Sequence, residues 1–180
     1  FQIATNAPNL GSRNEAIAFL TDEKLLTELL KNEDWHIRKQ TIMKVRDQQQ
    51  IAQIALHDPD GYVREQAAPL LTDQKLRAQI ALNDTDSHVR NAALEGLSDT
   101  ILLLSIVLQS TYRETQLNAL QLIGNAEILL EIARANPNQE LRKKAFSQIN
   151  DSHVLNQIAL SESDQELRSL AIKLLTDKTI

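Results

Sequence analysis

A repeating unit of 26 residues is the sequence feature that most constrains how this chain folds. Residues 60–68 read Asp-Gly-Tyr-Val-Arg-Glu-Gln-Ala-Ala, and residues 86–94 repeat this pattern as Asp-Ser-His-Val-Arg-Asn-Ala-Ala-Leu. The arginine of the repeat belongs to a column with a first step of 25 residues and later steps of 26: Arg13, Arg38, Arg64, Arg90, Gln116, Arg142 and Arg168. Repetition at a fixed period of this length indicates an array of stacked supersecondary units.

Each unit reads as two short helices. Val63, Ala67 and Leu71 have the spacing of one helical face, and Asp60 stands at the N-cap position before them. Asp73 occupies the same position before the next helix. Helices of roughly eight to ten residues are marginal alone in water, so neighbouring units must bury one another's apolar faces. Pro69 falls inside an Arg-bearing helix, where it is expected to bend or shorten that helix.

The pattern Asp-x-x-x-Arg-x-x-Ala-x-x-x-Leu, with an aliphatic helix after it, resembles HEAT-like repeats. The short unit is most similar to the bilin-lyase type, and it also resembles the leucine-rich variant repeat. This resemblance implies an all-α fold, a right-handed α-solenoid of about seven two-helix units with a period of 26 residues, whose Arg-bearing helices line the concave face. It also implies mostly protein-binding scaffolds, with a minority of enzymes and nucleic-acid binders.

We expect one array over residues 1–180, with both ends cut inside units, and hence an excerpt of a longer array. Exposed apolar end faces would then favour end-to-end self-association. The expected units lie near residues 9–33, 34–59, 60–85, 86–111, 112–137, 138–163 and 164–180.

Composition narrows the classes of partner. The formal net charge is −5 and the pI is about 5.4, which disfavours a nucleic-acid surface. The sequence has no Cys, so disulfides and thiolate chemistry are excluded. No apolar run approaches the roughly 20 residues of a membrane span. We therefore expect a cytoplasmic protein that binds neither nucleic acid nor membrane.

An acidic column lies four residues before the arginine column. In HEAT-like repeats such pairs form a ladder between repeats, and the resemblance implies the same structural ladder here. The open alternative is an arginine stripe that binds anions. The ladder residues are Asp34, Arg38, Asp60, Arg64, Asp86, Arg90, Asn138, Arg142, Asp164 and Arg168.

A second column lies two residues before each arginine and changes from aromatic and His side chains to acidic ones. On a concave face it would form a partner-binding stripe; the alternative is an exposed first-turn position, where Glu suits the helix dipole. The stripe residues are His36, Tyr62, His88, Glu114, Glu140 and Glu166. No His or carboxylate group has metal-ligand spacing, and we expect no metal, cofactor or catalytic residues.

One unit departs from the pattern. Gln116 replaces the arginine, Tyr112 the acid and Asn125 the capping Asp, and Arg134 stands in a Leu column. This unit is either a kink or binding patch around Tyr112, Arg113 and Gln116, or sequence drift, which we favour. Trp35 begins a helix beside Asp34 and reads as a packing residue.

Three functions fit these observations. The first is a non-enzymatic scaffold that binds another protein or neighbouring domains of the same chain, and it is preferred because a coherent repeat occurs without a coherent reactive cluster. The second is an enzyme on the same fold, either bilin-lyase-like or base-excision-like. The third is an architectural spacer in a larger protein.

Overall fold

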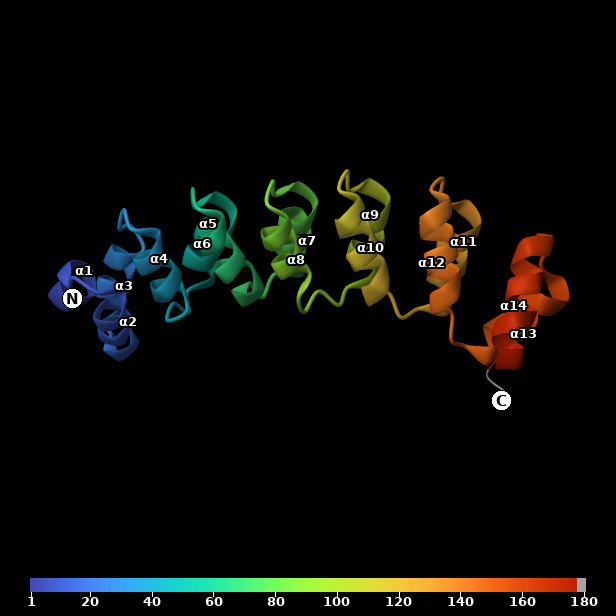
Figure 1. Cartoon of the computed structure of the whole chain (residues 1–180), viewed down its shortest axis with the longest axis horizontal. Coiled ribbons are helices and arrows are strands. Elements are labelled where there is room, and N and C mark those ends of the chain that lie inside the picture. The colour runs from blue at the N-terminus through green and yellow to red at the C-terminus, as the bar shows by residue number, and fades with distance from the viewer. Residues whose placement is uncertain (178–180) are drawn as a thin grey trace. The chain divides into compact units, whose positions relative to one another are not determined.

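The computed structural model describes residues 1–177, and over that range the protein folds into α-helices, one short 3-10 helix and no strands (Figure 1). The all-α prediction is therefore confirmed. The chain divides into two compact units between Asn118 and Ala119.

The first unit contains the helices up to the division, which falls inside α10. They are α1 (Gln2–Asn6), α2 (Leu10–Phe19), α3 (Glu23–Leu29), α4 (Trp35–Ile42), α5 (Gln48–His57), α6 (Gly61–Ala67), the 3-10 helix η1 (Ala68–Leu70), α7 (Gln74–Asn83), α8 (Ser87–Leu94), α9 (Thr100–Gln109) and α10 (Arg113–Leu122). The second unit continues with α11 (Ala126–Ala135), α12 (Gln139–Gln148), α13 (Ser152–Ser161) and α14 (Gln165–Asp177).

Capping side chains set where the helices begin. The Asp60 carboxylate accepts a hydrogen bond from the backbone N–H of Tyr62 at 2.9 Å, which satisfies a donor that has no partner inside α6. Asp73 caps α7 in the same way through the N–H groups of Lys75 and Leu76. The N-caps predicted at Asp60 and Asp73 are confirmed.

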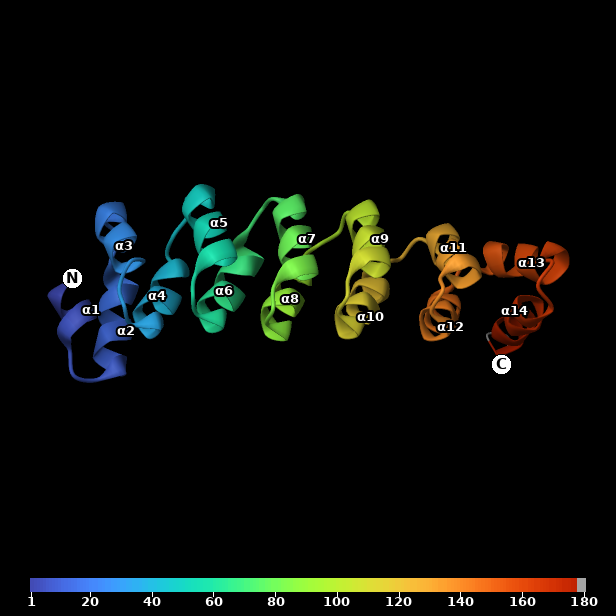
Figure 2. The ribbon, with the colours of Figure 1, turned by 90° about the horizontal axis from the view of Figure 1, so that it is seen from above.

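Consecutive Arg-bearing helices pack on one another inside the first unit. Helix α4 contacts α2 and α6, and α6 contacts α8; the intervening helix α7 contacts α5 and α9 (Figures 1 and 2). Ile37, Val63 and Val89, which occupy one position of the repeat, are at most 1% exposed. Each helix thus buries its apolar face against its neighbours, and this burial is the main favourable term in their stability.

The second unit is built from two helix pairs. Helix α11 packs on α12, and α13 packs on α14. Its buried side chains include Leu129, Leu141, Phe146 and Leu155, each at most 2% exposed.

Pro69 shortens its helix as expected. Helix α6 ends at Ala67 and the chain continues as η1, because proline lacks the N–H that an α-helix needs and its ring crowds the preceding turn. The repeat that places an N-cap at Asp73 also places one, with a further helix after it, at Asp177, but α14 instead runs through to Asp177. The remainder of that expected helix lies outside the described residues.

Candidate functional site

Buried arginine–aspartate pairs connect neighbouring repeats of the first unit. Arg38 donates from Nε and Nη2 to the two carboxylate oxygens of Asp58, both at 2.8 Å. The two side chains are only 9% and 2% exposed. Arg64 makes the same two-bonded contact with Asp84, at 2.8 and 2.9 Å. The side-chain hydrogen bonds that Arg38 donates to Asp58 and Arg64 donates to Asp84 raise the pKa of each arginine.

The arginines also donate hydrogen bonds to backbone carbonyl groups earlier in the chain. In each case Nη1 donates to the carbonyl oxygens six and five residues earlier, where the preceding helix has just ended. For Arg38 these are the oxygens of Asn32 and Glu33, at 2.8 and 2.9 Å. The same contact recurs at Arg64, Arg90, Arg142 and Arg168. At Arg38 and Arg64, one guanidinium therefore closes its own loop and also binds the next repeat.

The arginine partners differ from those expected from the sequence. Asp60 and Asp86 do not accept from the arginines: each caps its own helix, as do Asn138 and Asp164. Asp34 does accept from an arginine, Arg13, whose Nη1 lies 2.6 Å from its carboxylate. The acids that pair with Arg38 and Arg64 lie two residues nearer the N-terminus than the expected column. That position is visible in the sequence as a separate column: Asn32, Asp58, Asp84, Ser110, Asn136 and Glu162.

Arg90 has a different environment because Ser110 stands where an aspartate would pair with it. Its Nε donates to the hydroxyl of Thr115 at 2.9 Å, and the Tyr112 ring covers the guanidinium with 3.5 Å between ring centroid and Cζ. Gln116 preserves one function of the missing arginine, since its Nε2 donates to the Ser110 carbonyl oxygen at 2.9 Å. The unit that departs from the pattern thus keeps its internal contacts through other side chains.

In the second unit the acid of this column is bound by a different residue. Glu162 accepts from Nε and Nη2 of Arg134, the residue that stands in a Leu column. The hydrogen bond from the Arg134 side chain lowers the pKa of Glu162. Arg142 and Arg168 keep their carbonyl contacts.

The predicted stripe includes a partly exposed aromatic cluster in the first unit. Trp35 stacks on His36 with ring centroids 3.6 Å apart, and on Tyr62 of the next repeat at 5.2 Å. Lys39 Nζ lies 5.5 Å from the centre of the Tyr62 ring. Tyr62 remains 58% exposed despite these contacts. Trp35 therefore packs, as expected, but against an exposed ring and not in the core.

The rest of the stripe is polar and mostly solvent-exposed. Nδ1 of His88 lies 3.3 Å from Oδ1 of Asp86, the residue that caps the same helix. Oε1 of Glu114 accepts a hydrogen bond from Nδ2 of Asn91 at 3.2 Å. Glu140 and Glu166 are exposed on the second unit. The structure thus brings His36 and Tyr62 of the stripe together through Trp35.

Contacts with neighbouring histidines lower the pKa of two capping aspartates, Asp34 and Asp86. Burial alone would raise the pKa of Asp34, but hydrogen bonds from the side chain and backbone of His36 outweigh it and lower the pKa. The backbone hydrogen bond from His88 lowers the pKa of Asp86. Both carboxylates are held in the ionised form that a helix N-terminus favours.

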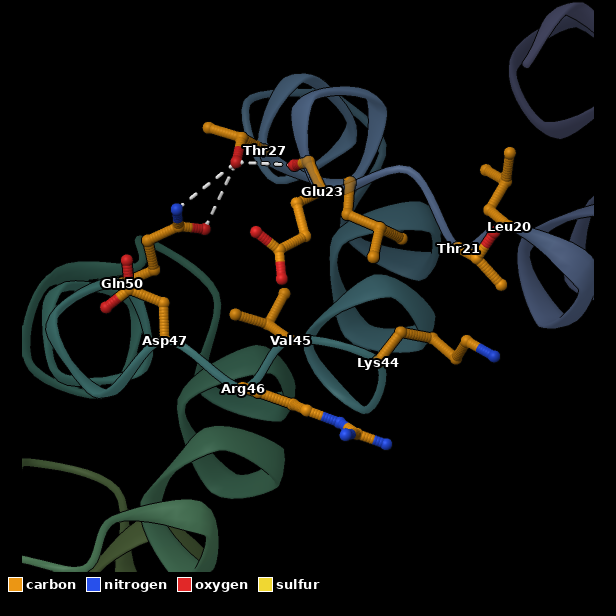
Figure 3. Close-up of a pocket in the computed structure, with 10 residues that line it drawn as sticks. Leu20, Thr21, Glu23, Thr27, Lys44, Val45, Arg46, Asp47 and Gln50 are labelled. Atoms are coloured by element: carbon orange, nitrogen blue, oxygen red, sulfur yellow. Dashed lines mark hydrogen bonds between the residues drawn. The ribbon is translucent and has the colours of Figure 1, made fainter.

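A pocket of about 310 Å³ lies between α3, α5 and the loop that follows α4. Leu20, Leu26 and Val45 give it apolar walls, while Thr27 and Gln50 contribute polar groups. Figure 3 shows the Glu23 carboxylate directed into the space between Val45 and the Thr27–Gln50 hydrogen bonds. No pattern in the sequence predicted this pocket.

Among the described residues, no group of three or more His, Cys, Asp or Glu side chains is arranged to hold a metal ion. None of the helices in residues 1–177 is both long enough and apolar enough to cross a membrane. Comparison with family models, curated proteins and solved structures found no match for this chain.

Proposed function

We propose that this chain forms a right-handed α-solenoid of about seven HEAT-like repeats, with a period of 26 residues, and acts as a non-enzymatic protein-interaction scaffold. Its binding surface is the exposed column on the Arg-bearing helices, centred on His36, Tyr62 and His88. The partner is another protein or a neighbouring domain of the same chain, in the cytoplasm.

The observation that carries this proposal is the stacked aromatic cluster of Trp35, His36 and Tyr62. Two neighbouring repeats present it together, and more than half of the Tyr62 side chain stays in contact with water. Aromatic side chains of this kind are enriched at the centres of protein interfaces, because they bury a large area at low conformational cost. A protein partner is favoured over nucleic acid because the chain has a net charge of −5.

The arginines are a poor alternative binding surface. Arg38 and Arg64 already use their donors on Asp58, Asp84 and loop carbonyls, so they have little capacity left for an anion. Their chemistry supports a role in joining repeats, as proposed for the ladder, with Asp58 and Asp84 as the acids.

Photo-crosslinking in the cell of origin tests the proposal. A crosslinking amino acid at position 62 should capture a defined protein, and the Trp35→Ala variant should reduce that capture. Ile101, which is 76% exposed on α9, is the matched control: its replacement by Ala should leave the interaction intact. Equal capture by the wild type and the Trp35→Ala variant would refute a binding role for the cluster. This is the result that the spacer hypothesis predicts. Reproducible turnover of a small molecule would favour the enzyme hypothesis.

A further inference from the structure

A glutamine at the start of the intervening helix ties successive repeats together in the first unit. Gln48, the first residue of α5, donates from Nε2 to the Leu70 carbonyl oxygen at 3.2 Å and accepts from the Thr72 N–H at 2.9 Å. Gln74, the first residue of α7, makes the same pair of bonds with Gly96 and Ser98, at 3.1 and 2.9 Å. We call this two-bond contact the glutamine clamp.

Glu23 occupies the clamp position of α3. It lies ten residues after Arg13, as Gln48 lies ten residues after Arg38. The loop groups that would complete a clamp are the carbonyl of Lys44 and the N–H of Arg46. These residues follow Arg38 by six and eight positions, as Leu70 and Thr72 follow Arg64. A carboxylate accepts hydrogen bonds but cannot donate them, so Glu23 cannot bond the Lys44 carbonyl. The exposed Glu23 side chain thus offers only acceptors at the position where α5 and α7 have a glutamine donor.

The pocket of about 310 Å³ lies at this junction, and Glu23, Lys44 and Arg46 all line it. The Glu23 carboxylate makes no hydrogen bond or ion pair with any described residue. Its cationic neighbours are directed elsewhere: Lys44 Nζ donates to the Ala18 carbonyl oxygen at 2.7 Å, and Figure 3 shows both Lys44 and Arg46 extending away from Glu23. The second acid, Asp47, caps α5 through the Gln49 N–H.

We propose that this pocket binds a guanidinium or primary ammonium group, with Glu23 as its anchor. Such a cation supplies the N–H donors that the glutamines supply at the other junctions, and it also neutralises the carboxylate. The apolar side chains of Leu20, Leu26 and Val45 would contact the aliphatic stem of the ligand. The negative charges of Glu23 and Asp47 balance the positive charges of Lys44 and Arg46, so the net charge of the pocket does not select a cation. Selectivity for a cation therefore depends on direct contact with Glu23. The site is separate from the aromatic stripe and does not depend on the proposed scaffold function.

Titration monitored by ¹H–¹⁵N NMR tests the site. Propylguanidinium should shift the amide signals of residues 23–27 and 44–50 in a saturable way, whereas propylurea, its neutral analogue, should not. An acetylated arginine amide tests whether the bound cation comes from a protein side chain or from a free small molecule. Binding as tight as that of propylguanidinium indicates that an arginine side chain of a protein fits the pocket. Weaker binding indicates a free small molecule.

The Glu23→Gln variant supplies the decisive control. It restores the clamp donor, so it should lower the affinity for propylguanidinium at least about tenfold, a difference near 1.4 kcal/mol, and raise the midpoint of thermal unfolding. Glu28→Gln removes the same charge from α3 and should leave binding unchanged. Unaltered binding in Glu23→Gln, equal binding of propylurea, or no saturable shift at millimolar ligand would each overturn the proposal.

Discussion

Removing the Asp58 carboxylate tests the geometry of the ladder most directly. Asp58 accepts three hydrogen bonds: two from Arg38 at 2.8 Å each, and one from the Asp60 N–H at 2.9 Å. The Asp58→Ala variant leaves a guanidinium that is only 9% exposed without its counter-charge. Breaking a buried pair in this way costs about 3–5 kcal/mol of unfolding free energy.

The matched comparison is Asp60→Ala, two residues away. Asp60 caps α6 through the single bond to the Tyr62 N–H, and the loss of an N-cap costs roughly 1 kcal/mol. If the acidic column four residues before each arginine carried the ladder, Asp60→Ala would be the more damaging change. The structure predicts the opposite order, with a difference of at least about 2 kcal/mol between the variants.

Urea unfolding followed by far-UV circular dichroism measures this difference. With a slope of about 1–3 kcal/mol per molar urea, Asp58→Ala should lower the midpoint by about 1 M or more. The double variant Arg38→Met/Asp58→Leu removes both charges and should recover much of the loss, because apolar pairs of similar volume often replace buried ion pairs without penalty. A midpoint for Asp60→Ala at or below that of Asp58→Ala would refute the reasoning, as would a double variant no more stable than Asp58→Ala.

Three further variants test other contacts. Gln48→Glu keeps the acceptor of the clamp but removes its donor, so it should destabilise the protein by about 1 kcal/mol in the same urea assay; an unchanged midpoint would show that the clamp contributes nothing. Gly96 has a φ of 71°, and an added Cβ would lie 3.0 Å from an arginine nitrogen, so Gly96→Ala should cost about 1–2 kcal/mol, whereas a neutral result would contradict the strain. The folded-state pKa values of Asp34 and Asp86 lie below their ordinary 3.8, so their contribution is present above about pH 4 and lost as the pH falls through the lowered values. The variant Asp34→Asn/Asp86→Asn should therefore lose less stability than the wild type between pH 5 and 2, and identical pH profiles would show that these carboxylates do not contribute.

Local chemistry allowed much of the fold to be predicted from the sequence. The helical class, the N-caps at Asp60 and Asp73 and the break at Pro69 depend on interactions within a few residues. Such interactions are nearly the same wherever the segment lies in the molecule, because cap geometry and the constraints of proline are set by the adjacent backbone. The exposed position of Tyr62 follows from the same helical periodicity.

Only the tertiary structure decided which acid pairs with each arginine. Asp58 and Asp60 both follow Arg38 by about twenty residues, and the sequence contains no measure of which carboxylate the stacked helices bring within hydrogen-bonding distance. The stacking of α4 on α6 places Asp58 against the guanidinium, while Asp60 turns to its own helix. The pocket beside Glu23 has the same origin, because packing brings together its walls from α3, α5 and the loop after α4. Contacts between segments distant in sequence depend on how helices approach and rotate, and that information exists only once the chain has folded.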